Sequence, residues 1–282
     1  MALQRMATQL RTLAFARSEE CGFWKSTIDC LARYRSHRIY SRLDRNVTPI
    51  QEDPADGRAL WRIPNGQLWA PRPERWTLVS NLAEQERGFY GKGVRGIRDG
   101  DVVLDCGANL GTFTSHALTM GAQLVVAIEP GPETAGCLRK SFAHEPRVVI
   151  EASGVWDENC TLALNQSSVT SAANTFVLPL EQQQGRSTVP VRTIDSIVES
   201  LSLARIDFIK MDIEGAECRA LSGGRRTIHA WKPRLAICTY HLPNDPANIA
   251  GIVRSIRADY HIQYGFREEV RGRITPRVLH CW

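Results

Sequence analysis

From Val102 onward, short apolar runs typical of strands alternate with segments that have the periodicity of helices. DVVLDC precedes a helical pattern over 111–120, and QLVVAIE precedes one over 132–143. Further along, RVVIEA, IDFIKMDI and RLAICTY are strand-like, with helical patterns over 214–230 and 245–258. This alternation predicts an α/β fold with a mostly parallel sheet and helices on both faces.

The last two apolar runs, DYHIQYGF and TPRVLHCW, have no helix-length segment between them and predict an antiparallel hairpin. An open parallel sheet that ends in a hairpin is the layout of class I methyltransferases rather than of dehydrogenases. We therefore expect a Rossmann-like fold with a sheet of about seven strands. Residues 153–192 interrupt the alternation, and we expect extra strands there around the polar loop SSVTSAAN.

Residues 1–97 precede this pattern and are expected to form a helical and hairpin extension to a methyltransferase domain at 98–282. The segment WRIPNGQLWAPRPERWTLVSNL predicts a hairpin followed by an extended crossing, which we interpret as a lid or side wall. The first residues, MALQRMATQLRTLAFARSEE, predict an amphipathic helix that docks on the domain or, as the alternative, on an anionic membrane surface.

The composition limits the class of protein. The 282 residues include 35 Lys and Arg against 30 Asp and Glu, and a net charge of +5 is too small to indicate a nucleic-acid partner. No segment approaches the roughly 18 consecutive apolar residues of a membrane-spanning helix. The eight cysteines include no C-x-x-C pair, which favours reduced thiols and a cytoplasmic location. The oligomeric state is not predicted.

The loop after the first strand of the pattern runs Asp105-Cys106-Gly107-Ala108-Asn109-Leu110-Gly111. A dinucleotide-binding loop would have its first glycine where Asp105 stands, so that a diphosphate could approach. A carboxylate there would repel a diphosphate and attract a ligand ammonium. Gly107 and Gly111 are expected to admit that ligand, with Asn109 between them. The loop suits S-adenosylmethionine, which carries an ammonium, a sulfonium and a single carboxylate.

A second acid ends the next strand, in the sequence AIEPGP. Glu129 at this position could accept hydrogen bonds from both hydroxyls of the cofactor ribose. Pro130 and Pro132 would end the strand and start the next helix, which fixes the direction of the acid. A strand-end glutamate can also be merely solvated, but its spacing from the glycine loop favours cofactor binding.

A third cluster, IDFIKMDIEGAECRAL, concentrates charge where another buried strand ends. Glu214 and Glu217 could simply favour the dipole of the helix that follows. Lys210 and Asp212 lie on one face of the strand by alternation, and we expect them to pair. The carboxyl end of a central strand is the usual place for a ligand, so Asp212 is a candidate catalytic residue.

These motifs resemble the FkbM family of S-adenosylmethionine-dependent methyltransferases. GDVVLDCGANLGTFT, VVAIEPGPE, TIDSIV and IDFIKMDIEGAE are similar to its successive motifs and stand in the same order, over about residues 84–245. Family members are typically O-methyltransferases that act on hydroxyls of sugars, polyketides or other small metabolites. The resemblance therefore implies a small-molecule hydroxyl acceptor.

Methyl transfer to a hydroxyl calls for a group that accepts its proton. Asp212 and His241 are the candidate bases, and Lys210 could orient Asp212. His241 also has a structural interpretation, as a cap of the strand before Pro243. A Mg²⁺ ion held by Asp212 and Glu214 is a less favoured alternative.

Two other classes of function stay open at this point. A nucleic-acid methyltransferase is disfavoured because Arg and Lys are dispersed and no Asn-Pro-Pro-aromatic motif follows the fourth strand. A non-catalytic module that only binds the cofactor is disfavoured because both the cofactor acids and the Asp212 cluster are present.

Overall fold

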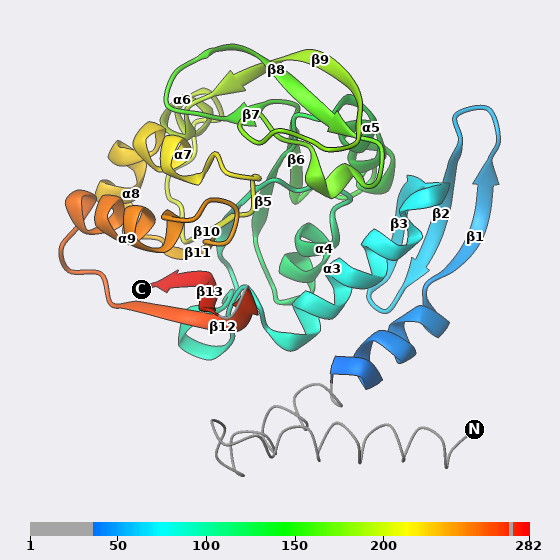
Figure 1. Cartoon of the computed structure of the whole chain (residues 1–282), viewed down its shortest axis with the longest axis horizontal. Helices are drawn as coiled ribbons and strands as arrows, with labels where there is room; N and C mark the ends of the chain where they lie inside the picture. Colours follow the sequence, from blue (N-terminus) through cyan, green and yellow to red (C-terminus); the bar gives the residue numbers. More distant parts are fainter. Residues whose placement is uncertain (1–35, 271–272) are drawn as a thin grey trace.

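A seven-stranded sheet lies at the centre of the structure, with the strand order β12-β13-β11-β10-β4-β5-β6 (Figure 1). The pairs from β11 through β6 are parallel, whereas β13 is antiparallel to both β11 and β12. The mostly parallel sheet and the C-terminal hairpin are therefore confirmed. The strands are β4 Val102–Cys106, β5 Leu124–Ile128, β6 Val148–Glu151, β10 Phe208–Met211, β11 Arg234–Cys238, β12 Ile262–Val270 and β13 Arg273–Cys281.

The structure is a computed structural model that describes residues 36–270 and 273–282. The amphipathic helix predicted at the start of the chain lies outside these residues. Within them, no helix is both long enough and apolar enough to cross a membrane. The predicted cytoplasmic location is not tested by this observation.

Helices cover both faces of the sheet, because the side chains of a strand alternate between the faces. Leu104 and Ile209 pack against α6, α7, α8 and α9, whereas Val103 and Phe208 pack on the other face with Phe113 of α4. The helices are α4 Thr112–Thr119, α5 Pro132–Ser141, α6 Ile194–Ser200, α7 Glu217–Gly223, α8 Arg225–Trp231 and α9 Asp245–Ile256.

The single helix predicted over 214–230 is wrong in two respects. α7 begins three residues later, because Glu214 and Gly215 have left-handed backbone with φ of 53° and 97°. It ends at Gly223, and a second helix, α8, follows. Gly223 lies so close to the carbonyl of Trp156 that a Cβ would collide with it, and glycines weaken a helix. The left-handed turn lies at the edge of the pocket described below.

The described part of the chain before residue 97 contains a helical stretch over 36–46, a three-stranded sheet and a further helix, α3. The elements after residue 46 are β1 Thr48–Asp53, β2 Arg58–Ile63, β3 Gly66–Pro71, α3 Arg75–Arg87 and short 3-10 turns at Arg72–Glu74 and Gly93–Arg95. The β2-β3 pair confirms the predicted hairpin, but the extended crossing after it is wrong. Pro71 and Pro73 start the 3-10 turn that leads into α3, a position that suits the fixed φ of proline.

α3 packs directly on the main domain. Leu78, Val79 and Leu82 share a buried cluster with Leu110, which precedes α4. The N-terminal extension thus packs against the side of the main domain, as expected for a side wall, which was one of its two predicted roles (lid or side wall). The domain boundary at residue 97 stays a prediction.

A third sheet, in the order β7-β9-β8, confirms the extra strands predicted over 153–192. Its strands are β7 Gly154–Val155, β8 Cys160–Ser167 and β9 Gln183–Arg192. The polar loop between β8 and β9 is tied to the start of α3 by Glu74, which accepts hydrogen bonds from the backbone N–H of Ser171 at 2.5 Å and from the hydroxyl of Thr170 at 3.1 Å. The loop therefore reaches the same pocket as α3.

Candidate active site

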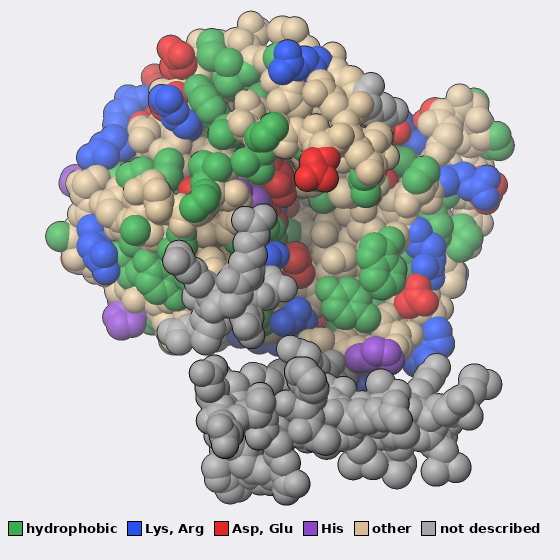
Figure 2. Space-filling view, in the orientation of Figure 1, with side chains coloured by type: hydrophobic (Ala, Val, Ile, Leu, Met, Phe, Trp, Pro, Cys, Tyr) green, Lys and Arg blue, Asp and Glu red, His purple; other side chains and the backbone are tan. Residues whose placement is uncertain are grey.

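A pocket opens where the parallel strands β4, β5 and β10 end, the usual place for ligands in such sheets. α3 and the loop between β8 and β9 complete its walls. In the space-filling view the face of the molecule is hollowed near its centre, with acidic side chains around the hollow (Figure 2). The predicted site residues that line the pocket are Gly107, Asn109, Glu129, Pro130, Lys210, Asp212 and Glu214.

Asp105 lies beneath the pocket rather than in its wall. Its carboxylate is fully buried, accepts a hydrogen bond from Thr114 Oγ1 at 2.7 Å, and pairs with Lys210 Nζ at 3.1 Å. The prediction that Asp105 contacts a ligand ammonium is wrong, because an ammonium of the chain itself takes that place.

Lys210 therefore pairs with Asp105, and the predicted pair of Lys210 with Asp212 is wrong. Lys210 lies opposite Asp105 in the register of β10 and β4, so the two side chains meet on one face. Its Nζ also donates to the carbonyl of Gly107 at 2.6 Å. Burial opposes the charge of Lys210, but Asp105 and then Asp212 raise its pKa above the ordinary value. Lys210 keeps its proton and ties the glycine loop to β10.

The two glycines of the loop have structural reasons for lacking a side chain. Both have left-handed backbone, with φ of 78° at Gly107 and 84° at Gly111. A Cβ on Gly107 would collide with the backbone carbonyl of Asp212, and a Cβ on Gly111 would collide with Phe142 and Leu138 beside α5. Gly107 also lines the pocket, but Gly111 does not, so the prediction that Gly111 admits the ligand is wrong.

Glu129 faces the pocket from the end of β5 and is firmly positioned. Its Oε1 accepts hydrogen bonds from Gly131 N–H at 2.9 Å and Thr134 Oγ1 at 2.8 Å, and its Oε2 accepts one from Asn109 N–H at 2.9 Å. Burial raises the pKa of this carboxyl. Because Asn109 belongs to the glycine loop, the hydrogen bond joins the ends of β4 and β5. Pro130 follows Glu129 in the pocket wall.

Asp212 follows β10 and points into the pocket. Its Oδ2 accepts a hydrogen bond from the hydroxyl of Tyr90 at 2.7 Å, and its Oδ1 accepts a long one from Tyr240 at 3.4 Å. Burial acts to raise its pKa, but Lys210 and His241 hold the pKa of Asp212 below its ordinary value. The pocket thus holds an ionised carboxylate at the end of its central strand.

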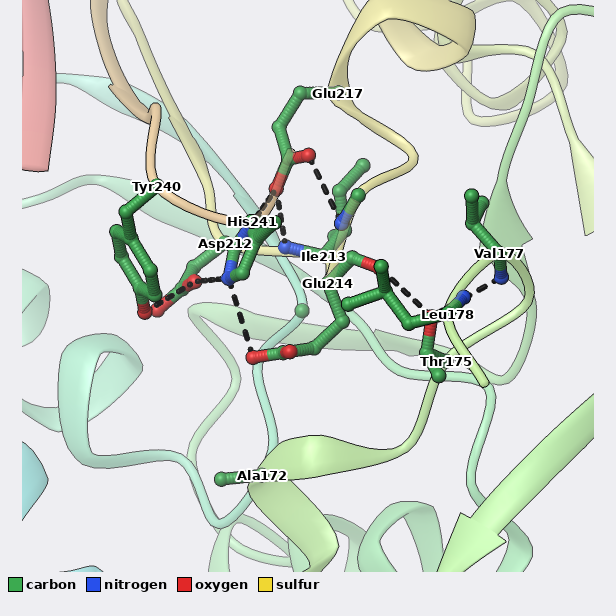
Figure 3. A network of polar contacts seen from close by, with 12 residues as sticks. Ala172, Thr175, Val177, Leu178, Asp212, Ile213, Glu214, Glu217, Tyr240 and His241 are labelled. Atoms are coloured by element: carbon green, nitrogen blue, oxygen red, sulfur yellow. Dashed lines mark hydrogen bonds and ion pairs between the residues drawn. The ribbon is translucent and has the colours of Figure 1, made fainter. Parts of the chain in front are cut away.

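His241 lies between three carboxylates and not at the surface of the pocket (Figure 3). Burial acts to lower its pKa, but Glu214 and Glu217 raise the pKa of His241 well above its ordinary value. An imidazole that keeps both protons cannot accept another one. The arrangement therefore argues against His241 as the general base, and it also differs from a simple strand cap.

α3 contributes pocket residues that the sequence analysis did not predict: Ser80, Asn81, Glu84 and Gln85. Glu84 Oε2 accepts a long hydrogen bond from the Tyr90 hydroxyl at 3.4 Å. Burial, and then the charge of Asp212, raise the pKa of Glu84 to about 7. These polar residues are spaced about one helical turn apart, which indicates that they share one face of a helix. This spacing could have been used as a signal only if the segment had been predicted to be a helix.

Residues 105–267 match the family model described as the methyltransferase FkbM domain, which is more than half of the chain. The chain belongs to this methyltransferase family. The resemblance seen in the sequence motifs is therefore confirmed. The class I methyltransferase fold, with its Rossmann-like sheet, agrees with this assignment.

The chain is also similar to two other methyltransferases. The hexuronic acid methyltransferase AglP of Haloferax volcanii is 24% identical over 170 residues, which cover 60% of this chain and 68% of AglP. A crystal structure of methyltransferase FkbM from Methylobacillus flagellatus aligns with a TM-score of 0.51 and 20% identity. That alignment covers 88% of this chain but only 59% of the longer protein, and it supports the fold alone.

Proposed function

We propose that the protein transfers a methyl group from S-adenosylmethionine to a hydroxyl of a small, sugar-like acceptor. The observation that carries this proposal is a single pocket whose two parts are lined by different polar side chains. Glu129 and Asn109 lie at one end, and Asp212, Tyr90 and Glu84 lie between β10 and α3. When bound, the cofactor would supply a methyl group on a positively charged sulfonium. The residues of the chain would hold both molecules and receive the proton of the acceptor.

The cofactor end has free hydrogen-bonding capacity. Asn109 Oδ1 and Ser153 Oγ line the pocket and are buried without a hydrogen-bond partner among the described residues. Buried polar atoms normally have partners, so these two atoms are available to a polar ligand such as a nucleoside. The carboxylate oxygens of Glu129 have further lone pairs that could accept hydrogen bonds from ribose hydroxyls. The residues present therefore fit the cofactor.

Glu129→Ala is expected to weaken S-adenosylmethionine binding by about 1–3 kcal/mol, the range for hydrogen bonds to a charged group. Calorimetry on the purified protein measures this change. Part of the loss would come from Asn109, whose backbone N–H loses its acceptor. Unchanged affinity in a variant that melts like the wild type would remove Glu129 from the cofactor site.

The acceptor end supports a division of labour between two acids. The Tyr90 hydroxyl lies between them, 2.7 Å from Asp212 and 3.4 Å from Glu84. The ionised carboxylate of Asp212 would accept a hydrogen bond from the acceptor hydroxyl and align its oxygen with the methyl group. An aliphatic hydroxyl is a very weak acid, so its proton needs an acceptor as the methyl transfers. Glu84, across the pocket on α3, would take this proton.

In the wild type, turnover is expected to rise with pH around pH 7, and the substitution Glu84→Gln is expected to abolish this rise. Below its pKa of about 7 Glu84 is protonated and cannot accept a proton, so wild-type turnover should fall roughly tenfold per pH unit there. Asp212 opposes the ionisation of Glu84, whereas Lys210 and Arg277 favour it, and Tyr90 donates to it. Turnover from pH 5.5 to 9 at saturating substrate tests this role. If turnover of the variant still fell below pH 7 as in the wild type, the fall would belong to a group other than Glu84.

The charge of the pocket favours a hydroxyl over a carboxylate as the acceptor. A hexuronic acid, which the name of the relative AglP specifies, offers both groups. Glu84, Asp212 and Glu214 all line the acceptor end, where they would repel a carboxylate but accept hydrogen bonds from hydroxyls. We therefore infer an ether-forming O-methylation.

The proposal is tested by incubating the full chain with methyl-labelled S-adenosylmethionine and a panel of sugars, uronic acids and polyols. NMR of the product locates the methyl group. A methyl ether supports the proposal, whereas a methyl ester contradicts the hydroxyl acceptor. Cofactor binding without transfer across the whole panel would favour the non-catalytic binding module.

A further inference from the structure

The surroundings of His241 differ on the two sides of its ring. Its Nδ1 lies 2.9 Å from Glu217 Oε1, a normal hydrogen-bond length. Its Nε2 lies 3.2 Å from Glu214 Oε1 and 3.4 Å from Asp212 Oδ1. The side chain is only 2% exposed, so it is shielded from solvent. The two nitrogens therefore have different kinds of partner.

On the Nδ1 side, Glu217 is a fixed acceptor. It is fully buried, and its oxygens accept hydrogen bonds from the backbone N–H of Ile213 at 3.0 Å and of Gly215 at 3.1 Å. A carboxylate that holds one ring N–H orients the imidazole and leaves the other nitrogen to bind a metal, an arrangement common in metal sites.

On the Nε2 side, the contacts with the carboxylates are longer. Nε2 is buried without a hydrogen-bond partner among the described residues. Its distances to Glu214 and Asp212 exceed the roughly 2.7–2.9 Å of charge-assisted hydrogen bonds. Two ligand atoms that each lie about 2.1 Å from one ion are about 3.0–3.4 Å apart, and both distances fall in this range.

We propose that Asp212, Glu214 and His241 bind one divalent metal ion through Oδ1, Oε1 and Nε2, with the ion displacing the Nε2 proton of His241 and Glu217 orienting the imidazole. Ligand atoms of Asp212, Glu217 and His241 already lie within 4.8 Å of one another, whereas Glu214, 3.2 Å from Nε2, lies outside this group and would have to move toward Asp212 to share the ion. We assign Glu217 to the supporting role because its oxygens already accept backbone N–H groups. One imidazole with two carboxylates suits ions such as Mn²⁺ better than Mg²⁺, which prefers oxygen ligands alone.

The ion would face the acceptor end of the pocket, since Asp212 and Glu214 both line it. There it would act as a Lewis acid that makes an acceptor hydroxyl more acidic. The three carboxylates of Glu84, Asp212 and Glu214 would still outweigh the charge of one divalent ion, so the acceptor end would continue to disfavour a carboxylate. This catalytic meaning rests on the proposed function, but the presence of the ion does not. Metal binding can therefore be measured without cofactor, acceptor or turnover.

The test uses the full chain after chelator treatment, titrated with Mn²⁺ and followed by the electron paramagnetic resonance signal of free Mn²⁺. We expect one ion per chain. Glu214→Gln and Glu217→Gln should each weaken binding by about 10–100-fold, the range for loss of a ligand or its supporting partner. Glu84→Gln is the matched control, because it removes an acid of the same pocket outside the cluster, and it should bind Mn²⁺ like the wild type.

The absence of Mn²⁺ binding would overturn the inference and leave a protonated imidazole among three carboxylates. Equal binding by the wild type and Glu214→Gln would overturn it as well. Glu214 is 22% exposed at the pocket, so this variant should fold even where a change at Glu217 does not. If the protein binds the metal but transfers a methyl group to no acceptor, only the proposed function is contradicted. If the protein transfers the methyl group but binds no metal, only this inference is contradicted.

Discussion

Asp212→Asn is expected to lower turnover by about two to four powers of ten while leaving affinity for S-adenosylmethionine nearly unchanged. The substitution keeps the size of the side chain and one oxygen, but it removes the negative charge that would orient the acceptor hydroxyl. Asp212 follows β10, whereas Glu129, which would hold the ribose, follows β5, and β4 lies between these two strands. The loss should therefore appear in turnover and not in cofactor binding.

Asp259→Asn is a suitable control for this variant. Asp259 is 53% exposed, pairs with Arg257 and Lys232, and does not line the pocket. Chelator treatment then distinguishes between two possible roles of Asp212, as a metal ligand and as a group that acts directly on the acceptor. If activity disappears with chelator and returns with Mn²⁺, Asp212 acts as a metal ligand, and if the chelator has no effect, it acts directly on the acceptor. Full turnover by Asp212→Asn would leave Asp212 as a structural partner of Tyr90.

The central sheet could be predicted because its signals are local. Val102–Leu104 and Val125–Ile128 are continuous apolar runs, as buried parallel strands require, and helices of ordinary length lie between them. The position of Glu129 followed from the same pattern, since the carboxyl ends of adjacent parallel strands meet at one edge. Each of these predictions needed only a few consecutive residues.

The partners of Lys210 could not be predicted from its own strand. Lys210 and Asp212 share a face, but residues two apart on a strand are separated by about 6.6 Å along it. A residue opposite on the neighbouring strand is only about 4.8 Å away. Asp105 occupies that position, and it lies 105 residues earlier in the chain. Which residue lies opposite is decided by strand register, which depends on the packing of the whole sheet.

Glu84 was missed for a related reason. α3 buries Leu78 and Leu82 against the main domain and turns Glu84 toward the pocket. The pKa of Glu84 is raised by burial and by Asp212, which lies 128 residues further along the chain. No local pattern carries this information, and the preceding prolines favoured an extended segment.

Gly107→Ala is expected to destabilise the fold by at least about 3 kcal/mol, with cofactor binding lost as a consequence. An alanine in left-handed backbone costs about 1–2 kcal/mol by itself. The added Cβ would also collide with the backbone carbonyl of Asp212, which cannot rotate away as a side chain could. Relief requires β4 and β10 to separate at their carboxyl ends, where Lys210 donates to the Gly107 carbonyl at 2.6 Å.

Gly57→Ala separates the two costs, because Gly57 also has left-handed backbone, with φ of 68°, but no atom lies within 4 Å of its added Cβ. It should lose only the conformational part, about 1–2 kcal/mol. Thermal and denaturant unfolding of both variants measures the difference, which isolates the close approach of the two strands. If Gly107→Ala unfolded like Gly57→Ala yet failed to bind S-adenosylmethionine, the glycine would serve the ligand directly, and the contact between Gly107 and Asp212 would not be the reason that the position lacks a side chain.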